Sequence, residues 1–235
     1  MADSILYNKK YLTLNVPPPI LPAMASPHRH PPALHDRAIQ DLSFIRRTME
    51  GAASFSDVPG WALVGIGVSA LATAALAHAQ STTGRWLAIW IGEAVLASTA
   101  GTALLWLKMR RNGRASAAAP LTIPARKFFL GLLPAIVAGA MLTFALIDLR
   151  TIGSTPVSTG IPALLPGLWL TLYGTGIVTA GMHSVRAVPL MGLVFMTLGA
   201  IALIGSPALG EWMLAAGFGI THIGFGLWIA RRHGG

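Results

Sequence analysis

The chain has 235 residues, of which 54% are hydrophobic and only 11% are charged, and its mean hydropathy is +0.63. A soluble globular domain carries roughly 25% charged residues, so this composition excludes an ordinary water-soluble protein. The chain contains no cysteine, which excludes disulfides, thiolate chemistry and metal or iron–sulfur centres held by cysteine.

Residues 1–34 are predicted to form a disordered tail, because seven prolines between positions 17 and 32 interrupt any helix. His28, His30 and His35 lie close together in this part of the sequence. A flexible tract without carboxylate or thiolate ligands is nevertheless a poor site for a metal ion. We therefore predict no metal site, and we expect no cofactor in the chain.

Residues 35–57 are predicted to form a cytoplasmic amphipathic helix followed by a linker. Apolar residues at positions 38, 42, 45 and 49 recur on one helical face, and Arg46 and Arg47 lie on or beside its polar side. This pattern is typical of a helix that lies along a membrane surface with its arginines toward anionic lipid. A helix that binds a protein partner or dimerises is the alternative.

Six apolar segments of membrane-spanning length fill residues 58–230. They cover about 58–79, 85–107, 127–149, 161–182, 188–205 and 209–230. A bilayer core about 30 Å thick needs about 20 apolar helical residues per crossing, and a helix satisfies its own backbone hydrogen bonds. The sequence therefore predicts an all-α integral membrane protein, a compact bundle of six transmembrane helices with a short basic tail at 231–235.

The net charge of +9 comes from Lys and Arg residues that flank the predicted spans. With six spans, 15 of the 17 basic residues fall on one side, and only Arg85 and Arg150 fall on the other. Cytoplasmic loops carry the excess of Lys and Arg, so both termini are predicted to be cytoplasmic. The residues expected at the cytoplasmic lipid surface are Arg46, Arg47, Lys108, Arg110, Arg111, Arg114, Arg126, Lys127, Arg231 and Arg232.

The basic loop 108–127 raises the question of nucleic acid. No aromatic residues interleave its charges, so we interpret it as a solvated loop that faces anionic lipid and predict no nucleic-acid partner.

Tryptophans near the predicted span ends are expected at the headgroup level, where indole rings are favoured. These residues are Trp61, Trp106 and Trp228 at inner ends, and Trp86 and Trp212 at outer ends. Trp90 and Trp169 fit helix contacts better.

Small residues at every fourth position predict close packing of two of the spans. They are Gly65, Ser69, Thr73 and Ala77 in the first span, and Ala135 and Gly139 in the third.

Two ionisable residues lie well inside predicted spans, where Asp, Lys or Arg costs about 2.5–3.5 kcal/mol and is a functional candidate by default. Glu93 lies about 12 Å below the outer end of the second span, at 1.5 Å per residue, and is a candidate proton carrier. His222 lies near the middle of the sixth span among glycines, and Tyr173 lies at a matching depth in the fourth. The alternative is that these groups tie helices together through hydrogen bonds.

No catalytic motif accompanies these residues. The sequence has no H-E-x-x-H, Walker A or G-x-S-x-G pattern and no lysine in the middle of a span. His78 and His183 lie at span ends, so neither matches the depth of His222 for a bis-histidine haem. We therefore predict that the protein is not an enzyme.

Several stretches resemble a known group of proteins. They are Arg37–Glu50 (RAIQDLSFIRRTME), Val58–Trp61 (VPGW), Leu165–Trp169 (LPGLW), Tyr173–Gly176 (YGTG) and Ala230–Gly234 (ARRHG). Together they resemble an uncharacterised family of bacterial multi-pass, six-helix inner membrane proteins, over about residues 35–235. The resemblance implies a bacterial inner membrane location and brings no activity or catalytic residue with it.

The sequence leaves three functional classes open. The first is a non-enzymatic subunit or regulator of a larger membrane complex, with a protein partner or a second copy of the chain. The alternative is a small transporter or permease that uses Glu93 together with His222 and Tyr173. A membrane-embedded enzyme or cofactor binder is the third.

Overall fold

The computed structural model describes residues 34–52, 58–113, 115, 121–147, 154, 160–182 and 184–233. Several parts of the sequence lie outside these ranges: the predicted tail up to residue 33, the linker residues 53–57, Arg114, Arg150, His183 and the last two residues of the basic tail. The side chain of Arg47 is also outside the described part. The chain divides into two units, with the boundary between Ser43 and Phe44, so helix α1 and the helices after it are described separately.

Helix α1 covers Leu34–Ala52, close to the extent predicted from its periodicity. Its apolar residues Ile39, Leu42, Ile45 and Met49 are all at least half exposed. A helix is therefore present where one was predicted, and these apolar residues are exposed in the chain.

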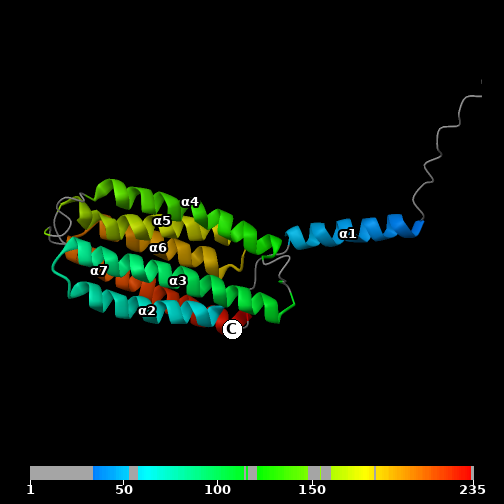
Figure 1. Cartoon of the computed structure of the whole chain (residues 1–235), viewed down its shortest axis with the longest axis horizontal. Coiled ribbons are helices and arrows are strands. Elements are labelled where there is room, and N and C mark those ends of the chain that lie inside the picture. The colour runs from blue at the N-terminus through cyan, green and yellow to red at the C-terminus, as the bar shows by residue number, and fades with distance from the viewer. Residues whose placement is uncertain are drawn as a thin grey trace, which may run out of the picture. The chain divides into compact units, whose positions relative to one another are not determined.

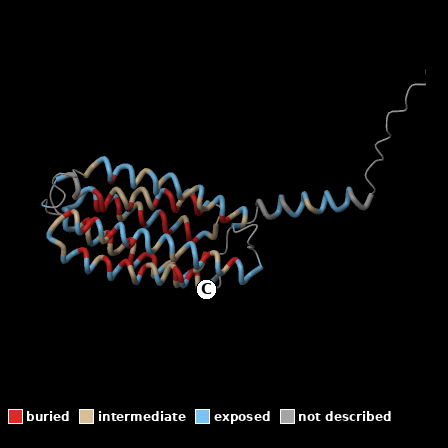
Figure 2. The backbone as a smooth tube through the Cα atoms, viewed as in Figure 1, coloured by how far each residue is buried: buried red, intermediate tan, exposed pale blue. Residues whose placement is uncertain are grey.

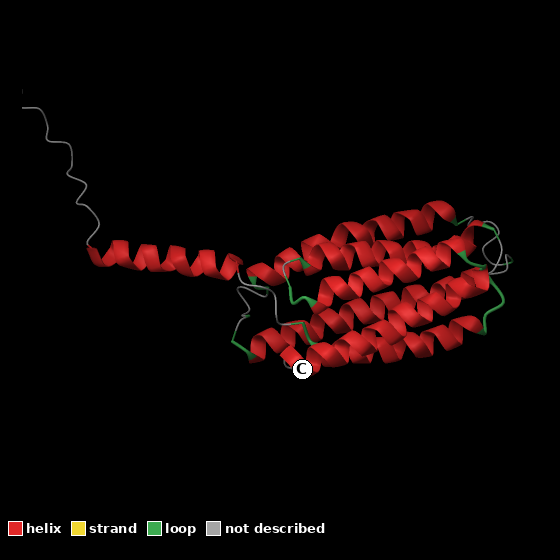
Figure 3. Ribbon diagram, turned by 180° about the vertical axis from the view of Figure 1, so that it is seen from behind, coloured by secondary structure: helices red, strands yellow, loops and turns green. Residues whose placement is uncertain are grey.

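The second unit is a bundle of helices that run side by side (Figures 1 and 3). They are α2 Gly60–His78, α3 Thr83–Arg111, α4 Ile123–Leu146, η1 Ile161–Leu164, α5 Leu165–Gly181, α6 Ala187–Ile204, α7 Pro207–Leu214, η2 Ala215–Thr221 and α8 His222–His233. The short η1 leads directly into α5. Helices α7 and α8 form one continuous helix through the π-helical turn η2. Each end lies within four residues of its predicted position. The predicted all-helical fold is confirmed.

Five helices are long and apolar enough to cross a membrane: α2, α3, α4, α6 and the continuous helix Pro207–Arg232. Helix α5 is apolar too, but it has only 17 residues. The chain is thus a membrane protein by the length and composition of five helices.

Helices α4 and α7 begin with local caps. The hydroxyl oxygen of Thr122 accepts a hydrogen bond from the backbone N–H of Ala125, and Ser206 does the same for Leu209. Each cap is followed by a proline in the first turn, where its missing N–H costs nothing. These caps fix where the chain turns back into the bundle.

The helices pack in a definite order. Helix α3 packs on α2, α2 packs on α8 and η2, α5 packs on α6, and α4 packs on α5, while α6 also contacts the last helix. Figure 2 shows the buried residues concentrated inside this unit, with few of them on α4. Helices α3 and α4 make little backbone contact with each other.

Glycines spaced seven residues apart bring two helix pairs into backbone contact. Seven residues make two helical turns, so such glycines lie on one face. In the α2–α8 pair, a Cβ atom added to Gly67 would lie 2.7 Å from the carbonyl oxygen of Gly219, and one on Gly226 would lie 2.8 Å from that of Gly60.

The α5–α6 pair repeats the pattern with Gly167 and Gly174 facing Gly199 and Gly192. A Cβ atom added to Gly174 would lie 2.7 Å from the oxygen of Gly192. A Cβ atom would meet the facing backbone at 3.0 Å or less at seven of these eight glycines, whereas at Gly219 it would meet the Leu71 side chain first.

The predicted fourfold stripes pack differently. Gly65 is exposed, and a Cβ atom there would meet nothing within 4 Å, so its assignment to a close interface is wrong. A Cβ atom on Gly139 would meet only the Leu172 side chain, at 3.9 Å, whereas Ala135 of the same predicted stripe packs closely against Gly176. The closest backbone contacts therefore lie at glycines seven residues apart, rather than along the predicted stripes of small residues at every fourth position.

Candidate functional site

One polar contact inside the bundle joins Tyr173 of α5 to His222 at the start of α8. The Tyr173 hydroxyl oxygen and the His222 Nε2 atom are 3.1 Å apart, and His222 is 1% exposed. The Nδ1 atom of His222 lies 3.0 Å from the carbonyl oxygen of Phe218, which can only accept. Nδ1 therefore carries the proton, and Nε2 accepts a hydrogen bond from the Tyr173 hydroxyl. The matching depths of these two residues predicted this neighbourhood, and the contact confirms it.

Aromatic rings enclose this pair. Phe195 of α6 meets Tyr173 edge-on at 4.9 Å between ring centroids, and it meets His222 at 5.2 Å. Phe218 stacks on His222 at 6.1 Å and also contacts Tyr173 and Phe195. The imidazole is thus held by two hydrogen bonds and two phenyl rings, which fix both its tautomer and its orientation.

A π-helical turn positions His222. In η2 the hydroxyl of Thr221 donates to the carbonyl oxygen of Ala216, five residues back, at 3.0 Å. Gly217 and Gly219 lie in the same turn, and a Cβ atom on Gly217 would lie 3.1 Å from the Phe195 ring. Turns of this kind insert one extra residue and occur often at functional sites. The run of glycines around His222 was visible in the sequence, whereas the π turn was not.

Glu93 forms a second polar site, between α3 and α2. Its carboxyl oxygens lie 2.6 Å from the Ser69 hydroxyl and 3.1 Å from the Thr73 hydroxyl, and the residue is 8% exposed. The Ser69 hydroxyl also lies 2.9 Å from the carbonyl oxygen of Ile66. A carboxylate accepts from both hydroxyls. A neutral acid can instead donate to Ser69, whose own proton then goes to Ile66, so both forms have partners.

The structure does not join Glu93 to the Tyr173–His222 pair through any described hydrogen bond. Trp90, one helical turn before Glu93, contacts Phe218 at 6.1 Å between ring centroids. The Trp90 Nε1 atom is buried and has no acceptor among the described residues. The two candidate groups are therefore separate sites on different helices.

A layer of tryptophans lies beyond this cluster, toward the start of α3. Trp86 is 1% exposed and stacks on Trp169 of α5 at 5.5 Å and 14°. The Trp169 Nε1 group donates to the Thr143 hydroxyl of α4 at 2.7 Å. Trp86 therefore makes a helix contact between α3 and α5, which had not been predicted for it, while its depth in a membrane stays a prediction. Trp90 and Trp169 make helix contacts as predicted.

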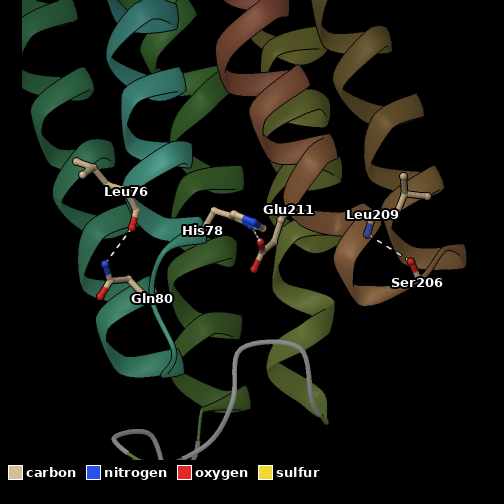
Figure 4. Close-up of polar contacts among 6 residues, drawn as sticks. All are labelled: Leu76, His78, Gln80, Ser206, Leu209 and Glu211. Atoms are coloured by element: carbon tan, nitrogen blue, oxygen red, sulfur yellow. Dashed lines mark hydrogen bonds and ion pairs between the residues drawn. The ribbon is translucent and has the colours of Figure 1, made fainter.

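A histidine–glutamate contact lies at the end where α2 finishes and α7 begins. Figure 4 shows the His78 ring pointing at the Glu211 carboxylate, with 3.0 Å between Nδ1 and Oε2. Trp212 contacts the same imidazole at 6.2 Å. This pairing was not predicted from the sequence, in which both residues look like ordinary span-end residues.

The basic residues gather at the opposite end, where α2 begins and α3 ends, which we call the basic end. Described side chains that are exposed there belong to Arg110, Arg111, Arg126, Lys127, Arg231 and Arg232. Arg110 lies 4.7 Å from the ring centroid of Trp106. Lys108 is half-buried and donates to the carbonyl oxygen of Val58 at 3.4 Å. Arg46 is exposed on α1.

Among the described residues, no three His, Asp or Glu side chains gather in a way that could hold a metal ion. Comparison with protein-family models, with curated proteins and with solved structures found no match to this chain. The resemblance noted in the sequence therefore stays a prediction.

Proposed function

We propose that this protein is a non-enzymatic, multi-pass protein of the bacterial inner membrane that acts as a subunit or regulator of a larger complex. The observation that carries the proposal is the packing of α4. Only 6% of its apolar segment is buried, against 39% for α6 and for the last helix. Its large exposed residues include Leu133, Val137 and Met141.

Lipid can cover such a face, but it does little to hold the helix in place. Helices in a bilayer associate through close packing and hydrogen bonds, because lipid tails are as apolar as leucine. Helix α4 packs chiefly on α5, so a helix from a partner or a second copy would supply the packing that the chain itself does not.

The proposal includes six crossings, with both termini and α1 at the cytoplasmic face. Support for a sixth crossing comes from α5, which lies against α4 and α6, both long enough to span. The Lys and Arg residues at the basic end support the cytoplasmic placement. The exposed apolar face of α1 supports a helix on the membrane surface.

The decisive experiment places a photo-crosslinking amino acid at Val137 or Met141 of α4 in native membranes. The matched control carries it at Leu193 of α6, which is similarly exposed and apolar. We expect the α4 positions to trap one defined protein, identified by mass spectrometry, and Leu193 to trap lipid. Equal lipid-only labelling at all three positions would contradict the proposal.

Transport is the second candidate function, and the Glu93 site is the observation that favours it. The Ser69 and Thr73 hydroxyls accommodate Glu93 with or without its proton, as a proton carrier requires. Glu93→Gln preserves the shape but removes the exchangeable acid. Loss of proton-coupled flux in liposomes, with an unchanged fold, would establish this candidate. Unchanged flux in an active preparation would remove Glu93 from it.

A further inference from the structure

A cavity of about 120 Å³ lies inside the bundle, toward its basic end. Helices α2 to α6 all contribute to its walls, through residues such as Leu63, Gly101, Leu132 and Ile177. The only polar side chain in its lining belongs to Tyr173, whose hydroxyl already bonds to His222. An apolar cavity of this size stays dry and takes apolar guests. Its occupant should therefore be hydrocarbon.

The cavity extends between α3 and α4. Leu105 and Gly101 of α3 line it, as do Phe128 and Leu132 of α4, and these two helices make little backbone contact. They meet nearer the basic end, where the Thr122 hydroxyl lies 3.9 Å from the Met109 sulfur. The cavity wall between α3 and α4 is therefore formed by side chains rather than by close packing of the two backbones.

Positive charge borders the cavity at the basic end. Val58 lines the cavity, and its carbonyl oxygen accepts the 3.4 Å hydrogen bond from the Lys108 ammonium group. On α4, Arg126 and Lys127 are exposed and immediately precede Phe128 of the lining. A Lys residue of α3 thus bonds to a residue of the cavity wall, and two basic residues of α4 precede another wall residue in the sequence. Positive charge therefore lies at this end of the apolar space, where it complements an anionic headgroup with an attached chain.

We propose that this cavity binds one anionic phospholipid, with part of an acyl chain inside and the phosphate at Lys108 and the start of α4. The spacing fits, because Gly101 lies seven residues from Lys108, about 10 Å along the helix at 1.5 Å per residue. That depth is within one leaflet of a bilayer core about 30 Å thick. The site does not depend on a protein partner or on transport.

Native mass spectrometry of the delipidated full chain in detergent tests the site directly. The probes are phosphatidylglycerol and phosphatidylcholine with identical chains, added separately at equal concentration. We expect one tightly retained phosphatidylglycerol and weaker retention of phosphatidylcholine. Because this comparison uses the unaltered chain, it does not depend on how any variant folds. Equal retention of the two lipids would overturn the proposal.

Two variants locate the lipid, each with a matched control. Gly101→Leu places a side chain into the cavity, whereas Gly92→Leu on the same helix meets open space. The first should weaken retention at least about tenfold, since each buried methylene contributes to lipid binding, and the second should leave it unchanged. Lys108→Gln should weaken phosphatidylglycerol about fivefold, and Arg111→Gln less. Equal retention by the two glycine variants, both folded by circular dichroism, would refute the site.

Discussion

Replacing Gly67 with alanine tests whether glycine contacts hold the bundle together. The new Cβ atom would lie 2.7 Å from the carbonyl oxygen of Gly219 and 2.9 Å from the backbone nitrogen of Ile223. Ordinary van der Waals contact begins near 3.4 Å. Helices α2 and α8 would therefore have to separate by about 0.7 Å, and backbone atoms cannot turn aside as a flexible side chain can.

Overpacking of this kind typically costs about 1–3 kcal/mol in the free energy of unfolding. For a chain of this length, each kcal/mol lowers the melting temperature by about 2–4 °C. The expected shift for Gly67→Ala is therefore a fall of about 2–12 °C. Thermal unfolding in mild detergent, followed by circular dichroism and by size-exclusion chromatography, measures it.

The matched control is Gly65→Ala, two residues away on the same helix. Its Cβ atom would meet nothing within 4 Å, so it tests the general effect of alanine in a helix without the clash. Alanine is favoured over glycine in helices by up to about 1 kcal/mol, so this variant should be neutral or slightly stabilised. If both variants melt at the same temperature, the seven-residue glycine contacts do not hold α2 against α8.

The remaining predictions concern polar and aromatic contacts. Tyr173→Phe leaves Nε2 of His222 buried without a donor and should cost about 1–3 kcal/mol in unfolding free energy, measured in detergent against the unaltered chain. Trp86→Ala should cost about 3–5 kcal/mol, while Trp212→Ala on the exposed surface changes stability by less than about 0.5 kcal/mol. Comparable losses for the two tryptophans would contradict the stacked core. Glu211→Gln should cost less than about 1 kcal/mol, because the His78 side chain is largely exposed, and the loss should shrink further in high salt.

The sequence predicted the helices well because apolar segments of spanning length carry a strong signal. Each helix lies within four residues of its predicted ends, and Pro207, at the start of α7, marks a chain reversal that sequence alone indicates. Helix α5 differs from the predicted span, because the first residues of that span form the short η1 rather than α-helix. Length and apolarity alone therefore support five spans.

Helix contacts were harder to predict, since a sequence does not say which face meets which neighbour. Ser69 and Thr73 were assigned to a packing stripe by their small size, yet their hydroxyls bond to Glu93. The sequence placed these two residues on one face of a helix, but it did not show that this face meets Glu93 of α3. For the same reason, the stacking of Trp86 on Trp169 was not predicted, because these two residues lie on helices that are far apart in the sequence.

Because of the π turn, the last helix packs against different neighbouring helices before and after the turn. An α-helix turns about 100° per residue, so the extra residue of a π turn rotates everything after it by about that amount. Before the turn, Gly210 and Leu214 are buried; after it, His222, Gly226 and Ile229 are buried. With that rotation, the helix sets Gly210 against Pro166 of α5 before the turn, and Gly226 against Gly60 of α2 and His222 against Tyr173 of α5 after it. The Tyr173–His222 contact and the α2–α8 interface thus depend on the same seven residues of η2.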